Sequence, residues 1–196
     1  MAQSAILVDL DGTIWNSIPW YSGVLSAGNA TLAADLERNL RRGESLITMA
    51  ARRGVSKASL VRKCRECIDD LELYAGVRKT LEILNDKRVP MGVVTSLSGD
   101  LAMLMLEGTG IRPYFRTVIH PGNCRSSKAS GLPLRRALDD LRIAPSPKVL
   151  YIGDREDDAA CACACGVSFA WASYGYGLQP PKTSVLLSKF GEVLAL

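Results

Sequence analysis

Two carboxylates that directly follow an apolar run are the first residues in the chain that could do chemistry. Asp9 and Asp11 come after the apolar residues 6–8 and before a Gly-Thr pair. Charged groups at the end of a buried strand are costly to desolvate unless they bind a cation or take part in a reaction. A lone Asp-x-Asp can also be a turn former or a helix cap, but the flanking run and the Gly-Thr pair favour a reactive or cation-binding centre.

Three further polar groups could serve the same centre. Thr95 and Ser96 end an apolar run, and their hydroxyls could bind a phosphoryl oxygen, although such residues also cap helices. Lys128 lies in a loop before a helical pattern, where an ammonium group could bring a phosphate and an attacking carboxylate together. Asp154 ends another run, and Asp158 stands at the head of an Ala-rich helix. These two offer a metal ligand and a carboxylate that orients it.

The segments that must position these groups are of two kinds. Short runs rich in Val, Ile and Leu predict buried strands, and longer segments between them have helical spacing. The predicted strands are Ala5–Asp9, Met91–Thr95, Thr117–His120, Val149–Gly153 and Val167–Ala172. Continuous apolar runs are typical of a parallel sheet covered on both faces, so the predicted fold class is α/β with crossover helices.

The position of the polar groups on these strands is informative. In an open parallel sheet, ligands bind beyond the carboxyl ends of the strands, near the point where strand order reverses. Asp9, Thr95 and Asp154 each end a predicted strand. We therefore expect them to meet at one edge of the sheet.

The interval 15–74 breaks the alternation of strands and helices. It contains three amphipathic helical patterns, Leu25–Arg41, Glu44–Arg53 and Lys57–Leu73, and no convincing strand. This composition predicts a helical cap inserted into the core. The predicted domains are an α/β core formed by residues 1–14 and 75–196, and a helical cap formed by residues 15–74.

The cysteines and the single histidine favour structural roles. Cys64 and Cys67 have the spacing of a zinc or redox pair, but no second pair follows at a zinc-like distance. The alternating Cys161, Cys163 and Cys165 fit packing on a helix. With His120 as the sole histidine, a Ser-His-Asp triad or a His pair is hard to build.

Length and composition bound the class of protein. The 196 residues, 47% hydrophobic and 22% charged, suit a folded chain with a real core. The net charge of +4 is spread among acidic neighbours, so no nucleic-acid partner is expected, and mild positive charge suits a small anionic substrate. No secretory signal or membrane span is evident, so we expect a cytoplasmic protein without a membrane partner, as a monomer or homodimer.

The four motifs, in this order and at these intervals, resemble those of the haloacid dehalogenase-like superfamily, and specifically its phosphoglycolate phosphatase-like branch. The resemblance runs from Ala5 to about Gly177. It is close in the stretches YAGVRKTLEILNDKRVPMGVVTS and VLYIGDREDDAACACACG. It implies a Rossmann-like parallel-sheet core with a small mobile helical cap, and a magnesium-dependent phosphohydrolase acting on a small phosphorylated substrate.

The resemblance also implies roles for the motif residues. Asp9 would attack phosphorus and form an aspartyl-phosphate, while Asp11 would act first as general acid and then as general base. Mg²⁺ would be bound by Asp9, Asp154 and the backbone carbonyl of Asp11, with Asp158 as a partner behind these ligands.

The same resemblance assigns the phosphoryl group to Thr95, Ser96 and Lys128. Ser96 stands where the family often has Asn, and the proline pattern after Lys128 is met only at Pro133. Because branch members that dehalogenate lack the second carboxylate of the first motif, Asp11 favours phosphoryl chemistry.

Two alternatives remain open at this point, a phosphomutase that uses the same residues and a non-catalytic binding or regulatory protein. The sequence does not name the substrate. Aromatic and cationic residues of the cap could contact its leaving group. The candidates are Trp15, Trp20, Tyr21, Arg41, Arg42, Arg52 and Arg53.

Overall fold

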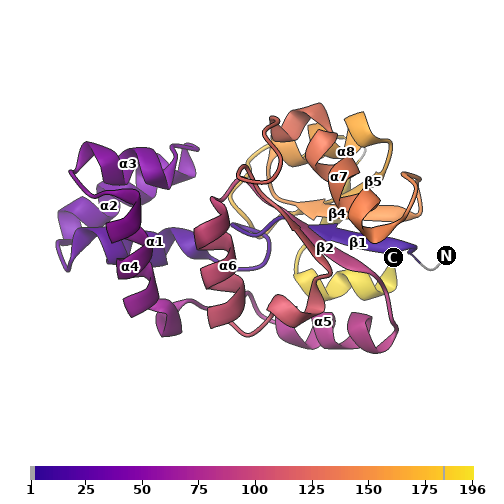
Figure 1. Ribbon diagram of the computed structural model, residues 1–196, viewed down its shortest axis with the longest axis horizontal. Coiled ribbons are helices and arrows are strands. Elements are labelled where there is room, and N and C mark those ends of the chain that lie inside the picture. Colours follow the sequence, from indigo (N-terminus) through magenta and orange to yellow (C-terminus); the bar gives the residue numbers. More distant parts are fainter. Residues whose placement is uncertain (1–2, 183) are drawn as a thin grey trace.

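A six-stranded parallel sheet forms the centre of the molecule (Figure 1). The computed structural model describes residues 3–182 and 184–196, so the first two residues of the predicted core lie outside the description. The strands are β1 Ala5–Val8, β2 Met91–Val94, β3 Thr117–Ile119, β4 Val149–Gly153, β5 Ser168–Ala172 and β6 Val185–Leu187. Their order is β3-β2-β1-β4-β5-β6. This arrangement confirms the predicted α/β fold class.

Helices cover both faces of the sheet. α5 (Val77–Asp86) and the C-terminal 3-10 segment (Phe190–Ala195) lie on one face, and α7 (Leu132–Leu141) and α8 (Glu156–Cys165) on the other (Figure 1). Along β1, alternate side chains enter two separate hydrophobic clusters, one on each face. Burial on both faces explains why the strands read as continuous apolar runs.

Four helices lie between β1 and α5 in the chain and stand at one end of the molecule (Figure 1). They are α1 Ser17–Ser26, α2 Ala30–Arg41, α3 Leu46–Arg52 and α4 Lys57–Glu66. We call them the cap helices. A further helix, α6 (Gly99–Gly108), follows β2 and stands between the cap helices and the sheet (Figure 1).

The predicted helix boundaries within the cap were partly wrong. The pattern Leu25–Arg41 spans a break, because Ala27 has a left-handed backbone (φ 47°) and separates α1 from α2. The helix α1 was missed, since its Pro, Ser and Gly have low helix propensity and most of its side chains are buried. The pattern Lys57–Leu73 ends earlier than predicted, and a short 3-10 turn, Ile68–Asp70, follows α4.

The two chain segments that join the cap helices to the sheet lie side by side. Trp15 pairs with Leu73 in an isolated antiparallel bridge, and the Tyr74 N–H donates to the Ile14 carbonyl at 2.9 Å. The indole of Trp15 is fully buried there. Both crossings are therefore held together, at the positions where the sequence predicts the boundary between core and cap.

The strand β6 was not predicted. It has only three residues at the sheet edge, and Val185 and Leu186 are exposed. The β1–β5 boundaries agree with the predicted ones to within one residue at either end.

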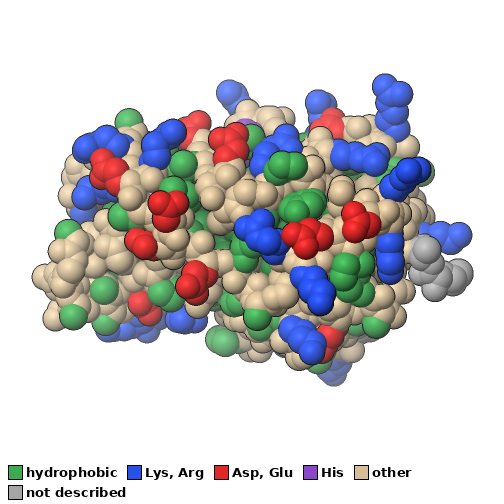
Figure 2. Space-filling model, turned by 90° about the horizontal axis from the view of Figure 1, so that it is seen from below, with side chains coloured by type: hydrophobic (Ala, Val, Ile, Leu, Met, Phe, Trp, Pro, Cys, Tyr) green, Lys and Arg blue, Asp and Glu red, His purple; other side chains and the backbone are tan. Residues whose placement is uncertain are grey.

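The surface is mixed in charge. Basic and acidic side chains are interspersed over the face shown in Figure 2. Within residues 3–182 and 184–196, no helix combines the length and apolar character needed to cross a bilayer.

Candidate active site

Three neighbouring strands deliver polar side chains to one edge of the sheet. β1 pairs with β2 on one side and with β4 on the other, and the chain reverses its direction of strand addition there. Asp9, Thr95 and Asp154 follow these strands directly and are all buried. The predicted meeting of these residues is therefore observed.

Three carboxylates and one ammonium group form the centre of this edge. Carboxylate oxygens of Asp9, Asp154 and Asp158 all lie within 4.8 Å of one another. Nζ of Lys128 lies 2.8 Å from Oδ1 of Asp9 and 2.5 Å from Oδ1 of Asp158. Burial alone would lower the pKa of Lys128, but the charges of Asp158 and Asp9 outweigh it and raise this pKa. The two carboxylates therefore favour the charged form of Lys128.

Both carboxylate oxygens of Asp158 have polar partners within the site. Besides Lys128, its Oδ1 lies 2.8 Å from the hydroxyl of Tyr151, and its Oδ2 accepts from the N–H of Arg155 at 3.0 Å. Such a carboxylate is held as a fixed counter-ion for Lys128.

Asp154, in contrast, has one carboxylate oxygen without a partner. Oδ2 accepts from the N–H of Tyr176 at 2.7 Å, whereas the buried Oδ1 has no hydrogen-bond partner in the structure. Burial, together with the charge of Asp158, raises the pKa of Asp154 to about 7. An unsatisfied buried carboxylate oxygen is costly unless a cation binds it.

The charges around Asp9 also favour the binding of a cation. Burial raises the pKa of Asp9 well above its usual value, Lys128 opposes this, and the charges of Asp158 and Asp154 add to it. Three buried acids with one lysine leave an excess of negative charge. The donor set of hard carboxylate oxygens fits a divalent cation such as Mg²⁺.

Asp11 lies outside the three-carboxylate cluster. Its Oδ1 accepts from Nε1 of Trp15 at 2.8 Å, and the hydroxyl of Tyr21 lies 3.4 Å from both of its oxygens. Burial raises the pKa of Asp11, and these hydrogen bonds and the charge of Arg155 only partly oppose the rise. A carboxyl group with a raised pKa is suited to donate a proton.

The two predicted hydroxyl residues differ in their environment. Thr95 is buried, and its Oγ1 accepts from the N–H of Leu97 at 3.2 Å, which leaves its hydroxyl hydrogen free to donate. Ser96 is exposed, and both residues line the cavity described next.

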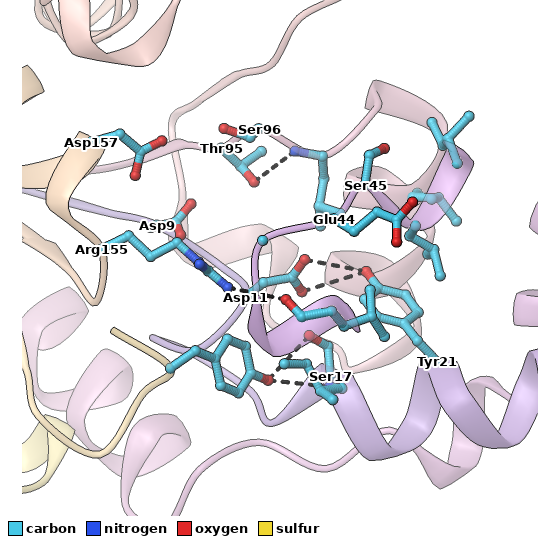
Figure 3. Close-up of a pocket in the computed structure, with 18 of the residues that line it drawn as sticks. Asp9, Asp11, Ser17, Tyr21, Glu44, Ser45, Thr95, Ser96, Arg155 and Asp157 are labelled. Carbon is cyan, nitrogen blue, oxygen red and sulfur yellow. Dashed lines mark hydrogen bonds between the residues drawn. The ribbon is translucent and has the colours of Figure 1, made fainter. Parts of the chain in front are cut away.

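A cavity of about 540 Å³ lies between this edge of the sheet and the cap helices (Figure 3). The motif residues Asp9, Asp11, Thr95 and Lys128 line its floor. From the cap side, it is lined by Ser17, Ile18, Tyr21, Leu40, Gly43, Glu44, Ser45, Leu46 and Ile47. The cavity thus joins the reactive groups to a wall made by the insertion.

Of the cap residues predicted to face the substrate, only Tyr21 lines this cavity. Trp15 is buried beneath Asp11, and Trp20 donates through Nε1 to the Cys67 carbonyl at 2.7 Å. Arg41 and Arg42 are exposed.

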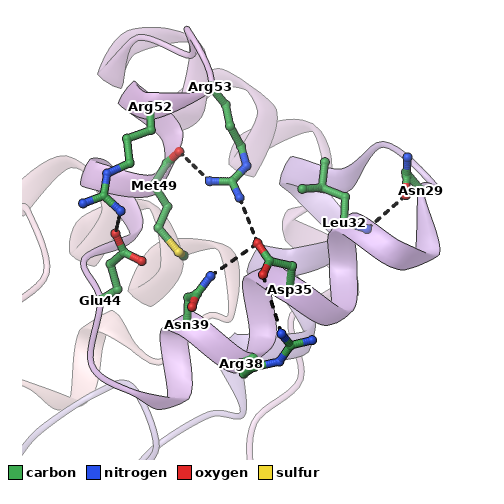
Figure 4. A network of polar contacts seen from close by, with 9 residues as sticks. All are labelled: Asn29, Leu32, Asp35, Arg38, Asn39, Glu44, Met49, Arg52 and Arg53. Atoms are coloured by element: carbon green, nitrogen blue, oxygen red, sulfur yellow. Dashed lines mark hydrogen bonds and ion pairs between the residues drawn. The ribbon is translucent and has the colours of Figure 1, made fainter.

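Two further predicted contacts, Arg52 and Arg53, belong to a surface network of the cap (Figure 4). Arg52 pairs with Glu44, and Arg53 lies 3.3 Å from Asp35. Both arginines pair with carboxylates of the cap itself. The presence of basic residues in the cap therefore did not indicate that their side chains face the substrate.

The structure adds two residues that sequence reasoning did not assign to the site. Arg155 and Tyr176 both line the cavity. Arg155 is adjacent to Asp154 in the fourth motif, so its position next to a metal-ligand candidate was a usable signal. Tyr176 lies in the segment YGYG after β5, where repeated Gly and Tyr could have drawn attention.

Cysteines and His120 have structural surroundings. Cys64 is buried in one hydrophobic cluster, and Cys161 and Cys165 are buried in the other. Nδ1 of His120 accepts from the Gly122 N–H at 3.1 Å within a loop after β3.

Gly12 is required by the close packing around Asp154. Its backbone has φ +79°, and a Cβ atom added there would lie 2.3 Å from Oδ2 of Asp154. We expect Gly12→Ala to lower the free energy of unfolding by about 2–3 kcal/mol, because it adds both backbone strain and overpacking. Urea denaturation measures the change.

A matched control is Gly23→Ala in α1, where an added Cβ meets nothing within 4 Å. This substitution should raise the free energy of unfolding by about 0.5–1 kcal/mol, because alanine is the better helix former. Equal effects of the two substitutions would refute the packing argument.

Comparison with known proteins agrees with this geometry. Residues 6–172 match the family model of haloacid dehalogenase-like hydrolases. A phosphoglycolate phosphatase of Rhodospirillum rubrum is 27% identical over 217 aligned positions, covering 98% of this chain and 88% of the relative. One of Chromobacterium violaceum is 28% identical, covering 88% and 86%.

Solved structures show the same fold. The HAD phosphatase from Thermococcus onnurineus has a TM-score of 0.74 at 19% identity, covering 100% of this chain and 97% of that one. CbbY from Rhodobacter sphaeroides, solved in complex with phosphate, has a TM-score of 0.77 at 16% identity, covering 98% and 96%. With the motif residues gathered at the switch point of the sheet and most of the chain matched, the chain belongs to the haloacid dehalogenase-like hydrolase family.

Proposed function

We propose that this protein is a magnesium-dependent phosphatase that hydrolyses a small phosphate monoester through an aspartyl-phosphate. The observation that carries the proposal is Asp9 on the floor of the cavity, paired with Lys128 and clustered within 4.8 Å with carboxylate oxygens of Asp154 and Asp158. The phosphoglycolate phosphatases among the relatives support this reaction class, and phosphoglycolate is the first substrate to test.

The residues that would hold Mg²⁺ are Asp9, Asp154 and the backbone carbonyl of Asp11. Asp158, which is bound to Lys128, would orient this set from behind. When bound, the ion supplies positive charge that offsets the phosphate oxygens and the carboxylates around them. Everything else in the reaction rests on side chains of the chain itself.

In the first step, a carboxylate oxygen of Asp9 attacks phosphorus in line with the ester oxygen. A bond forms between Asp9 and phosphorus, the bond to the ester oxygen breaks, and Asp11 gives its proton to the departing oxygen. The raised pKa of Asp11 and its position, fixed by hydrogen bonds from Trp15 and Tyr21, suit this donation. The products are an alcohol and an aspartyl-phosphate.

In the second step, water attacks the phosphorus of the aspartyl-phosphate. Asp11, now ionised, takes a proton from that water, and Asp9 leaves as a free carboxylate. Inorganic phosphate is released, and both aspartates return to their starting states.

The remaining predicted residues hold the transferring group. Lys128 favours the ionised form of Asp9 and offsets charge on the phosphoryl oxygens, while the free hydroxyl hydrogen of Thr95 donates to one of them. Ser96, which lines the cavity next to Thr95, offers a second hydroxyl group to the phosphoryl oxygens. We further propose that residues 15–74 act as a cap domain that closes over the substrate and excludes water, since the paired segments at residues 14–15 and 73–74 form a natural hinge.

Phosphate release tests the proposal directly. The protein is stripped of metal with a chelator and assayed on phosphoglycolate, sugar phosphates and nucleotides, with and without added Mg²⁺. Selective release that requires Mg²⁺ is expected. Transfer of the phosphoryl group within a sugar without net release would indicate a mutase instead, and binding without turnover would indicate a non-catalytic role.

Asp11→Asn separates the proton donor from the nucleophile. We expect a loss of about 10²- to 10⁴-fold in kcat/KM, which reports the first step, for alkyl phosphates, because their alkoxide is a poor leaving group without a proton. The loss should be much smaller for p-nitrophenyl phosphate, since nitrophenolate leaves readily. Equal losses for both esters, measured by steady-state kinetics, would exclude Asp11 as the general acid of the first step.

A further inference from the structure

Arg155 occupies an unusual place in the cavity. Its backbone lies on the sheet side, next to Asp154, and its side chain extends toward Asp11 and the cap (Figure 3). Nη2 lies 3.5 Å from the carbonyl oxygen of Leu40, the penultimate residue of α2. The guanidinium group therefore reaches from the core to the cap side of the cavity, where the leaving part of a substrate would lie.

The surroundings hold this side chain in place without neutralising it. The guanidinium carbon lies 5.8 Å from the centroid of the Tyr176 ring, within the range of a cation–π contact. A Cβ added to Gly43 would lie 3.6 Å from Nη1, so the cap loop passes close by. Among the described residues, no carboxylate oxygen lies within 4.0 Å of its guanidinium nitrogens.

The second basic side chain of the cavity is already paired with carboxylates. Of the described residues, Lys128 is the only other basic one that lines the cavity, and its ammonium group is paired with both Asp9 and Asp158. The remaining charged residues on the lining are acidic, and they are Asp9, Asp11, Glu44, Glu156 and Asp157. Within the described lining, Arg155 is therefore the cation that is left to bind an anionic group away from the phosphoryl position.

We propose that Arg155 is a specificity-determining residue that binds a second anionic group carried by the alcohol part of the substrate. A guanidinium group has five N–H donors in a planar fork that matches a carboxylate or a phosphate. Among residues 3–182 and 184–196, only Leu40 accepts a hydrogen bond from the Arg155 guanidinium. The inference rests on the proposed phosphatase function and narrows its substrates to phosphate monoesters with a carboxylate or a second phosphate.

Selectivity measurements test this role. We compare kcat/KM for phosphoglycolate and a small bisphosphate with kcat/KM for ethyl phosphate, which has no second anion. The wild type should prefer the two substrates with a second anionic group by roughly 10- to 100-fold, which is the usual effect of a charge-assisted bidentate contact. In Arg155→Gln this ratio should fall close to one, and Arg155→Lys should retain part of it. Comparison of phosphoglycolate with the bisphosphate shows whether Arg155 prefers a carboxylate or a second phosphate.

Arg41 provides the matched control. Its guanidinium carbon lies 5.9 Å from the same Tyr176 ring, but the residue is exposed and does not line the cavity. Arg41→Gln should therefore leave the preference for a second anion unchanged. If Arg155 only held the cap to the core through its contact with Leu40, then Arg155→Gln would lower kcat/KM for all esters by the same factor, and the proposal would be overturned.

A binding measurement makes the result independent of turnover. Titration calorimetry with phosphoglycolate and ethyl phosphate is done on Asp9→Asn and on Asp9→Asn with Arg155→Gln, both with Mg²⁺. Loss of the difference in affinity between the two ligands only in the double variant supports the role of Arg155. An unchanged difference in affinity overturns this role, even if no ester is hydrolysed. Absence of hydrolysis by the wild type would instead contradict the proposed phosphatase function.

Discussion

Asp9→Asn is expected to remove phosphate release almost completely, with kcat lower by about 10⁴-fold or more, because the amide cannot form the aspartyl-phosphate. The same change should not weaken the fold of the metal-free protein. It removes one of three buried carboxylates that lie within 4.8 Å of one another, and Lys128 keeps Asp158 as a partner. Mutational loss of function and retained stability together would identify Asp9 as the nucleophile.

The measurement combines a phosphate-release assay at saturating Mg²⁺ with thermal unfolding in chelator. Asp35→Asn is the matched control, since this carboxylate belongs to the surface network of the cap and does not line the cavity (Figure 4). It should leave turnover unchanged. If Asp9→Asn kept more than a few percent of wild-type turnover, another nucleophile would have to be sought.

Lys128→Met is expected to cost about 3–5 kcal/mol of unfolding free energy, as well as activity, because it leaves buried carboxylates without their cation. Lys128 is only 8% exposed, and its ammonium group contacts both Asp9 and Asp158. Burial penalises the charged form of Asp9, and the pKa of this residue should rise further once Lys128 is gone. Urea denaturation at neutral pH measures the loss.

Two companion variants isolate the electrostatic cause. Lys57→Met removes an ion pair between Lys57 and Asp100 that joins α4 to α6 at the surface, with side chains 49% and 63% exposed. Exposed pairs contribute roughly 0–1 kcal/mol, so little change is expected there. Adding Asp158→Asn to Lys128→Met should recover part of the stability, since one unpaired charge disappears. Additive losses in this double variant would contradict a coupled buried pair.

The amino-acid pattern by itself determined the strands and the reactive groups at their ends. Buried parallel strands are apolar on both faces, so β1, β2 and β4 stand out as continuous runs, and any carboxylate or hydroxyl that follows such a run is conspicuous. Parallel topology then requires these ends to share one edge. Asp9, Thr95 and Asp154 could therefore be placed together before the structure was known, and the same motifs carried the resemblance to the family.

Short and irregular elements escaped prediction for a physical reason. β6 is three residues long and half-exposed, so it has neither a long apolar run nor a clear alternation. The break between α1 and α2 lies at Ala27 and Gly28, which both have left-handed backbones, and Asn29 then caps α2 by accepting from the Leu32 N–H. Gly-Asn is a local stop and start signal, but the helical spacing of the residues on either side predicted one long helix where the protein has two.

Only the tertiary structure decided which side chains face the cavity. Arg52 and Arg53 were plausible substrate contacts, yet each turns to a carboxylate on the cap surface. Arg155 reaches the cavity because the sheet edge, the Tyr176 ring and the end of α2 meet around it. A long side chain has many rotamers of similar energy, and neighbours distant in sequence select among them. Sequence spacing fixes where such a residue lies along an element, and packing fixes what it contacts.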